Sequence, residues 1–169
     1  MSRRSRYLVG SLSLALVLLI VAATALAKPA TPMGGRFNGS AEAPGALAPG
    51  GATFKVSKSG SKFAVEVTLT FTLTCQVNGQ PFPVNTVISS KSFKQNESGA
   101  PLPVKNGKFS YKGATYGGAT PGTAEISGTF KSATKVTGSA HFSWPSLELA
   151  PTIEAPCDSG KLALTATHG

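Results

Sequence analysis

Residues 62 to 75 read Lys-Phe-Ala-Val-Glu-Val-Thr-Leu-Thr-Phe-Thr-Leu-Thr-Cys, and this stretch decides the fold. Its odd positions are apolar throughout, from Phe63 to Cys75, whereas its even positions are small or polar. Successive side chains of a β-strand point to opposite faces, so this period of two predicts a long strand with one buried and one wetted face. Cys75, which ends the apolar series, is therefore expected to point inward.

The composition predicts the same class of structure for the whole chain. The sequence has 169 residues, of which 14% are charged, and it contains 19 glycines and 12 prolines. β-Branched residues favour strands, and Gly and Pro favour turns. We therefore expect an all-β fold, an antiparallel β-sandwich or flattened barrel of about eight strands with one disulfide.

Residues 1 to 27 have the three parts of a secretory signal peptide. Basic residues at positions 3, 4 and 6 precede an apolar run from Leu8 to about Ala23, and Ala25-Leu26-Ala27 is an A-x-A cleavage site. The pattern predicts cleavage after Ala27 and export through the general secretory route to a secreted or extracellular location. Since the apolar run approaches the length that spans a bilayer, an uncleaved N-terminal membrane anchor remains an alternative.

The segment after the signal is rich in Pro, Gly and Ala. This composition predicts a flexible N-terminal tail over residues 28 to 51, followed by a single β domain over residues 52 to 169. Within the tail, Arg36-Phe37-Asn38 is a candidate for a short extra strand, because one aromatic residue among glycines needs a place to pack.

Turn signals divide the domain into further strands. Residues 53 to 57 are expected to form a hairpin with the first half of the long strand. Asn78-Gly79 and Asn106-Gly107 favour tight turns, since both residue types tolerate positive φ. The second of these turns predicts a hairpin with these inward residues: Leu102, Val104, Phe109 and Tyr111.

The last third of the chain predicts another hairpin and a closing strand. Residues 126 to 130 and 136 to 142 pair in this interpretation, with Gly128 and Gly138 leaving room for an aromatic residue of the opposite sheet. Prolines interrupt residues 145 to 156, for which a long loop is predicted. Leu162, Leu164 and Ala166 alternate in the last strand.

The two cysteines of an exported chain most simply form one disulfide, Cys75 to Cys157. The alternatives require residues that the chain does not supply in the usual pattern, because a redox pair is normally C-x-x-C and a zinc site needs further ligands. The Cα atoms of the two residues should lie roughly 4.4 to 6.8 Å apart.

The chain is basic, with a formal net charge of +9. Removal of the signal peptide leaves about +6, which favours association with anionic polymers or surfaces. Lysines stand singly beside the predicted turns, where they either protect sheet edges from pairing or form an anion-binding face. They are at positions 55, 58, 62, 105, 108, 131 and 135. Their spacing does not predict a nucleic-acid site, and no membrane partner is expected after signal removal.

The sequence contains no local catalytic or metal-binding motif. Asp158 is the one aspartate, and alternation directs Glu66, Glu125 and His141 outward. No G-x-S-x-G, P-loop or H-E-x-x-H pattern occurs. We therefore predict no catalytic residue, no metal, no cofactor and no enzymatic activity, while a site assembled from distant residues would leave no such signature.

Trp144 is the candidate ligand contact. It precedes Pro145 and the predicted loop, where an indole could stack on a sugar or another flat ligand. The alternative interpretation is that the indole packs at the end of the core.

A series of short motifs recurs in order along residues 54 to 167. It comprises Phe54 to Gly60, Cys75 to Gly79, Gly107 to Phe109, Ile126 to Phe130, Val136 to Gly138 and Cys157 to Lys161. In this order the chain resembles a group of small secreted bacterial all-β proteins of actinobacterial type, which have no established activity. The resemblance implies export and a sandwich-like fold, and it carries over no catalytic residue. Leu162 to Leu164 stand where that group has an aromatic residue.

These observations lead to a secreted, non-enzymatic protein that binds a glycan or an anionic wall polymer of the cell envelope. An extracellular inhibitor or structural accessory protein is the second hypothesis. A hydrolase whose site is assembled from distant residues is the third.

Overall fold

A computed structural model describes residues 29–43, 50–93, 101–117 and 120–169. The predicted signal peptide and its cleavage site after Ala27 lie outside the described residues. Within the part of the chain that is described, no helix has the length and apolarity needed to cross a membrane.

The described residues form a 10-stranded antiparallel sheet. Its strands are β1 (Gly35–Glu42), β2 (Gly50–Ser59), β3 (Lys62–Val77), β4 (Gln80–Ser89), β5 (Leu102–Val104), β6 (Lys108–Gly117), β7 (Thr120–Phe130), β8 (Lys135–Ala150), β9 (Ile153–Asp158) and β10 (Leu162–His168). A short 3-10 helix, η1 (Ser90–Phe93), follows β4. The all-β class is confirmed, with more strands than the predicted eight or so.

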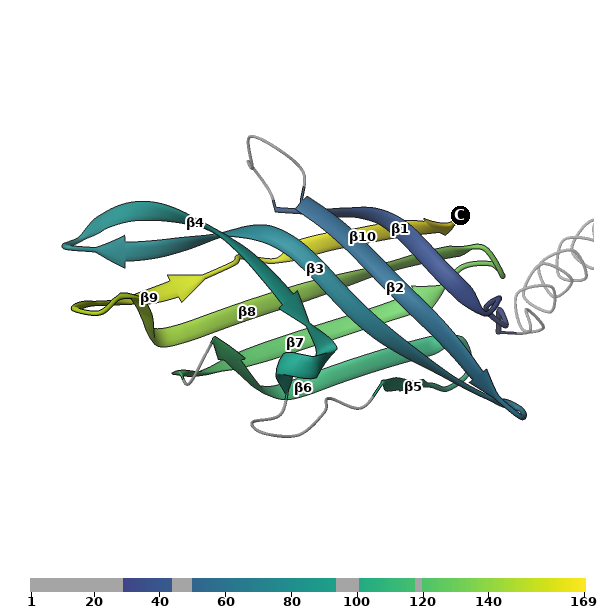
Figure 1. The fold of residues 1–169 in the computed structure, drawn as a ribbon. Coiled ribbons are helices and arrows are strands. Elements are labelled where there is room, and N and C mark those ends of the chain that lie inside the picture. The colour runs from purple at the N-terminus through teal and green to yellow at the C-terminus, as the bar shows by residue number, and fades with distance from the viewer. Residues whose placement is uncertain (1–28, 44–49, 94–100, 118–119) are drawn as a thin grey trace, which may run out of the picture.

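The sheet closes on itself. Its order is β10-β1-β2-β3-β9-β8-β7-β6, and β8 also pairs with β10, while β4 and β5 pair with β3 off this path. Figure 1 shows the resulting flattened form, in which β1, β2 and β3 cross over β6, β7 and β8. The core lies between these two layers, as expected for a sandwich or flattened barrel.

The alternation of the long strand is confirmed in β3. Its inward residues from Val65 to Cys75 are buried, while Phe63 is half-buried at the end of the strand. Ring contacts join the two layers, with centroids 5.5 Å apart for Phe37 and Phe130 and 5.1 Å apart for Phe71 and Phe142. Aromatic side chains therefore supply much of the contact across the core.

The predicted tight turns are present. The hairpin predicted around Asn106-Gly107 is reduced to the bridge between Lys105 and Lys108, because β5 pairs with β3 and β6 pairs with β7. The Asn-Gly turns have positive φ at both residues, 53° and 75° at Asn78 and Gly79, and 50° and 69° at Asn106 and Gly107. A two-residue loop with this geometry matches the twist of the strands that it joins. The hairpin of β2 and β3 also has the predicted pairing, with residues 54 and 56 opposite residues 67 and 65.

The prediction of a flexible tail over residues 28 to 51 is wrong for Gly35–Glu42 and for Gly50 and Gly51, while the candidate strand at Arg36-Phe37-Asn38 is confirmed. Gly35–Glu42 is β1, which pairs with both β10 and β2 and buries Phe37 completely. The glycine content was misleading, because a Cβ at Gly39 would overlap the backbone of Thr165 and Ala166 in β10. Glycine here permits close packing of strands, and the β domain therefore begins before residue 52.

The prediction of a long loop over residues 145 to 156 is also wrong. β8 continues to Ala150 and turns back as β9. The register shifts between Trp144 and Leu147 and again between Glu148 and Ala150. Such bulges accommodate proline inside a ladder, and Pro151 itself falls in the turn between the two strands.

The hairpin of β7 and β8 has the predicted glycine pair, but the aromatic ring that occupies the space beside it comes from a different strand than predicted. Gly128 lies directly opposite Gly138, and a Cβ at Gly128 would overlap the ring of Phe109. Phe109 belongs to β6, the strand adjacent to β7, and not to the opposite layer. Its ring nevertheless crosses the core, with its centroid 5.8 Å from that of Phe54.

β4 is an edge strand with unusual composition. It pairs with β3 over its whole length, and it carries Pro81 and Pro83 opposite Gln76 and Thr74. Phe82 between them remains 54% exposed. The outer half of this hairpin therefore buries little apolar surface.

Candidate functional site

The predicted disulfide joins Cys75 of β3 to Cys157 of β9. The two residues lie directly opposite each other in adjacent antiparallel strands, with a Cα–Cα distance of 4.0 Å. That distance is slightly below the predicted range, because facing residues of neighbouring strands approach closely. A disulfide between buried cysteines indicates an oxidising compartment.

Trp144 packs in the core and does not present a ring to solvent. Its side chain is 2% exposed, and its ring stacks on Phe142 with centroids 6.4 Å apart. The prediction that this indole contacts a flat ligand is therefore wrong, and the alternative, packing at the end of the core, is what the structure shows. Trp144 lies well inside β8 because the predicted loop after it is a strand.

The indole nitrogen of Trp144 faces the hairpin of β6 and β7. A Cβ at Gly122 would lie 2.5 Å from Nε1, and Thr115 is directly opposite Gly122. Trp144 Nε1 and Thr115 Oγ1 are buried and have no hydrogen-bond partner among the described residues. Burying an unpaired donor costs about 1 to 3 kcal/mol, so this end of the core is not optimised for stability.

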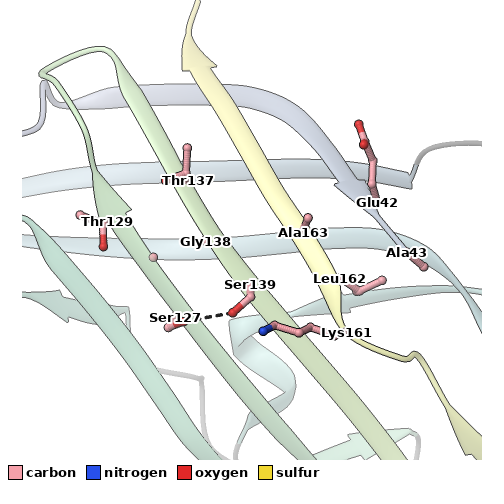
Figure 2. A pocket seen from close by; sticks show the side chains of 11 residues that line it. Glu42, Ala43, Ser127, Thr129, Thr137, Gly138, Ser139, Lys161, Leu162 and Ala163 are labelled. Carbon is pink, nitrogen blue, oxygen red and sulfur yellow. Dashed lines mark hydrogen bonds between the residues drawn. The ribbon is translucent and has the colours of Figure 1, made fainter.

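The outer surface of β7, β8 and β10 contains a groove of about 660 Å³ (Figure 2). Small hydroxyl side chains line it because β7 and β8 place serine opposite serine and threonine opposite threonine. These pairs are Ser127 with Ser139 and Thr129 with Thr137. The two serine hydroxyls are 3.3 Å apart.

Two charged side chains border this groove. Lys161 precedes β10, and Figure 2 shows it extending toward the serine pair. Glu42, at the end of β1, lines the other side, opposite Ala163 of β10. The groove thus offers hydroxyl groups along its floor with one cation and one anion at its sides.

A second groove, of about 530 Å³, continues the first along the same face. Both are lined by Ser127, Ser139 and Lys161, so together they form one outer trough. The second part adds side chains from β6, β7 and β8, including Lys112, Glu125 and His141.

Ionisable side chains form a row across this second part of the trough. Lys112 is opposite Glu125, which is opposite His141, and each pair lies in register on adjacent strands. His141 Nε2 is 3.1 and 3.0 Å from the two carboxylate oxygens of Asp158. The Lys112 ammonium hydrogen-bonds Glu125 and, with its charge, lowers the pKa of that carboxyl.

The side chains of Glu66, Glu125 and His141 point outward as predicted, but each of them contacts another ionisable side chain. Glu66 is 3.9 Å from Lys55, and the other two belong to the row of charges described above. Among the described residues no cluster of His, Cys, Asp or Glu could hold a metal ion.

No family model matches this chain, and no curated protein and no solved structure matches it. The resemblance to secreted actinobacterial-type proteins therefore stays a prediction, and the outer trough must be interpreted from its own chemistry.

The sequence interpretation missed the trough because its residues form no motif. Serine and threonine are common in strands. That Ser127 faces Ser139 and Thr129 faces Thr137 can be seen only when the register of the hairpin is known. The outward positions of the predicted hairpin contained this information. Pairing them across the turn would have indicated a strip of facing hydroxyls.

Proposed function

We propose that this protein is an exported binding module that holds a polysaccharide chain along the outer trough. The observation that carries the proposal is the continuity of the two grooves, which share Ser127, Ser139 and Lys161. An open trough suits an extended polymer better than a small molecule, which normally occupies an enclosed and mostly apolar pocket.

The lining has the chemistry that a sugar requires. Serine and threonine hydroxyls both donate and accept hydrogen bonds, as sugar hydroxyls do. Lys161 and Glu42 can form the stronger, charge-assisted hydrogen bonds to the same groups. With Trp144 buried, binding would depend on hydrogen bonds and not on stacking against an indole.

Location supports the same proposal. The signal peptide pattern predicts export, and the Cys75–Cys157 disulfide is stable in the oxidising environment outside the cytoplasm. Polysaccharides of the cell envelope or of the surroundings are the abundant polymers there.

Binding to an array of polysaccharides and to purified cell-wall sacculi tests the proposal. Ser139→Tyr should block the trough and abolish binding, while Ser127→Ala with Ser139→Ala should weaken it about fivefold to tenfold by removing hydroxyl contacts. Thr68→Tyr, which adds the same ring to an exposed position of β3, should bind like the unaltered protein.

Three results would count against the proposal. They are no binding to any polysaccharide, equal binding by Ser139→Tyr and the unaltered protein, and equal loss in Thr68→Tyr. If affinity capture from culture fluid recovered a protein partner while the polysaccharides gave no signal, the inhibitor hypothesis would replace it.

A further inference from the structure

The fold gathers at one end of the molecule lysines that are far apart in the sequence. The turns between β2 and β3, between β5 and β6 and between β7 and β8 all lie at the end that holds the C-terminus (Figure 1). Cross-contacts connect them: Phe130 N donates to Gly107 O at 2.8 Å, and Phe63 pairs with Val104. We call this the basic end, after its residues Arg36, Lys58, Lys62, Lys105, Lys108, Lys131 and Lys135.

The cations of the basic end are exposed and uncompensated. None of them forms an ion pair in the part of the chain that the structure describes; the described lysines that do are Lys55 and Lys112. The Nζ of Lys58 lies 5.6 Å from the centre of the Phe63 ring. Like charges held together without anions favour an external anionic partner.

The opposite end of the molecule is acidic. Glu148 and Glu154 face each other across the hairpin of β8 and β9, at the end remote from the C-terminus (Figure 1). The cations of the basic end and the anionic pair Glu148 and Glu154 therefore lie at opposite ends of the long axis. A molecule charged in this way turns its basic end toward a negative surface.

The described chain begins at the basic end. A Cβ at Gly107 would lie 2.6 Å from the Ala30 carbonyl oxygen, and Met33 N donates to Ala133 O at 2.9 Å. The polypeptide before Pro29 continues from here along the chain, and it includes Lys28 and the apolar run of the predicted signal. The first residues that the structure describes therefore lie at the basic end.

We propose that the basic end docks on an anionic lipid bilayer. Its lysines lie in or beside three separate turns and Arg36 lies near the start of β1, an arrangement that fits an extended plane of headgroups. Met33 at the same end is 45% exposed and can reach the bilayer interface. None of the cations of the basic end lines the outer trough, so the trough stays accessible in this orientation.

This proposal departs from the expectation that the mature chain has no membrane partner. That expectation was based on the lysines standing singly along the sequence. Sequence spacing does not show which turns lie at the same end of the folded molecule. Each lysine close to an anionic bilayer strengthens binding by about fivefold, and salt weakens the attraction over a distance of about 10 Å.

Vesicle flotation tests the proposal. The full chain is expressed in an exporting bacterial host, and the form that it yields is mixed with vesicles of phosphatidylcholine alone or with phosphatidylglycerol added. We expect binding to the anionic vesicles only, with loss on addition of salt.

Matched triple variants distinguish the basic end from total charge. Lys105→Gln, Lys108→Gln and Lys131→Gln together should weaken vesicle binding about a hundredfold, since each lysine contributes about fivefold. The control with Lys91, Lys112 and Lys161 changed to Gln removes the same charge elsewhere and should lose less than about fivefold. Near-ultraviolet circular dichroism of Trp144 checks that both variants fold.

Equal losses in the two triple variants would overturn the proposal, because binding would then follow net charge alone. Equal binding to neutral vesicles would overturn it as well. A third arm uses soluble polyphosphate, and binding to polyphosphate without binding to vesicles would assign the basic end to an anionic polymer instead. Polysaccharide binding by the trough is measured separately, so either proposal can fail alone.

Discussion

Replacing both cysteines with alanine should remove a large part of the stability of this fold. The disulfide joins residues with a sequence separation of 82. In the chain-entropy model a loop of this length restricts the unfolded state by about 4.5 kcal/mol. Since a domain is usually stable by about 5 to 15 kcal/mol, Cys75→Ala with Cys157→Ala is expected to be marginally folded.

The position of the disulfide predicts which strands lose protection from hydrogen exchange first in the double variant. β9 pairs with β3 through the residue pairs Thr74 with Asp158 and Cys75 with Cys157. The bridge therefore holds together the short junction at which β9 connects β3 to β8. In the double variant, amide protons of β9 and of the outer half of β8 should lose protection before those of the hairpin of β2 and β3.

Urea unfolding and native-state hydrogen exchange measure these two effects. We expect the free energy of unfolding to fall by about 4 kcal/mol, with reduction of the unaltered protein giving a similar loss. A fall of less than about 1 kcal/mol would refute the chain-entropy reasoning for this loop. Uniform loss of protection across the sheet would refute the local part of the argument.

Three further outcomes follow from single contacts. Gly128→Ala should destabilise the fold by about 1 to 3 kcal/mol in urea unfolding, because the new methyl meets the Phe109 ring. Gly51→Ala should not, because its new methyl would lie 3.9 Å from Thr70 Cβ, an ordinary van der Waals contact; equal effects would contradict this reasoning. Trp144→Phe should cost less than about 1.5 kcal/mol, since it removes a buried N–H that has no partner in the described structure; a loss above about 3 kcal/mol would indicate that this N–H is bonded. Lys112→Gln should raise the pKa of Glu125 in an NMR titration, and an unchanged value would refute the pairing; because the folded-state pKa is lowered, the stabilisation from this pair is present above the unfolded pKa and is lost as pH falls through the folded one.

Alternation was enough to predict the parts of the fold in which local pattern and tertiary burial agree. In β3 the inward residues could be identified one by one, since a long strand has only two faces. The Asn-Gly turns were equally predictable, because their geometry is set by the two residues themselves. The disulfide required only the count of cysteines and the predicted compartment.

The errors concern segments whose environment lies elsewhere in the chain. Gly39 resembles a linker residue in sequence, and its role becomes visible only when β10 packs against it. The prolines after Trp144 indicated a loop, but bulges let β8 continue past them. Trp144 was therefore expected at an open end, although its ring packs on Phe142 and beside the hairpin of β6 and β7.

The candidate sites could be predicted in part. The side chains of Glu125 and His141 were expected on the outer face, whereas the contact of His141 with Asp158 depends on β9, most of which had been interpreted as loop. The basic end could not be predicted from spacing, since it requires knowing that several hairpin turns lie on the same side of the sheet.

The prolines of β4 affect how copies of this protein meet at high concentration. Pro81 and Pro83 stay in register with β3, and proline is tolerated in an edge strand where its nitrogen faces away from the ladder, so the two residues leave gaps in the row of N–H donors along the free side of β4. A second copy that approached this margin would find too few donors to extend the ladder. β4, whose side chains are mostly exposed, is thus also a poor template for fibril growth.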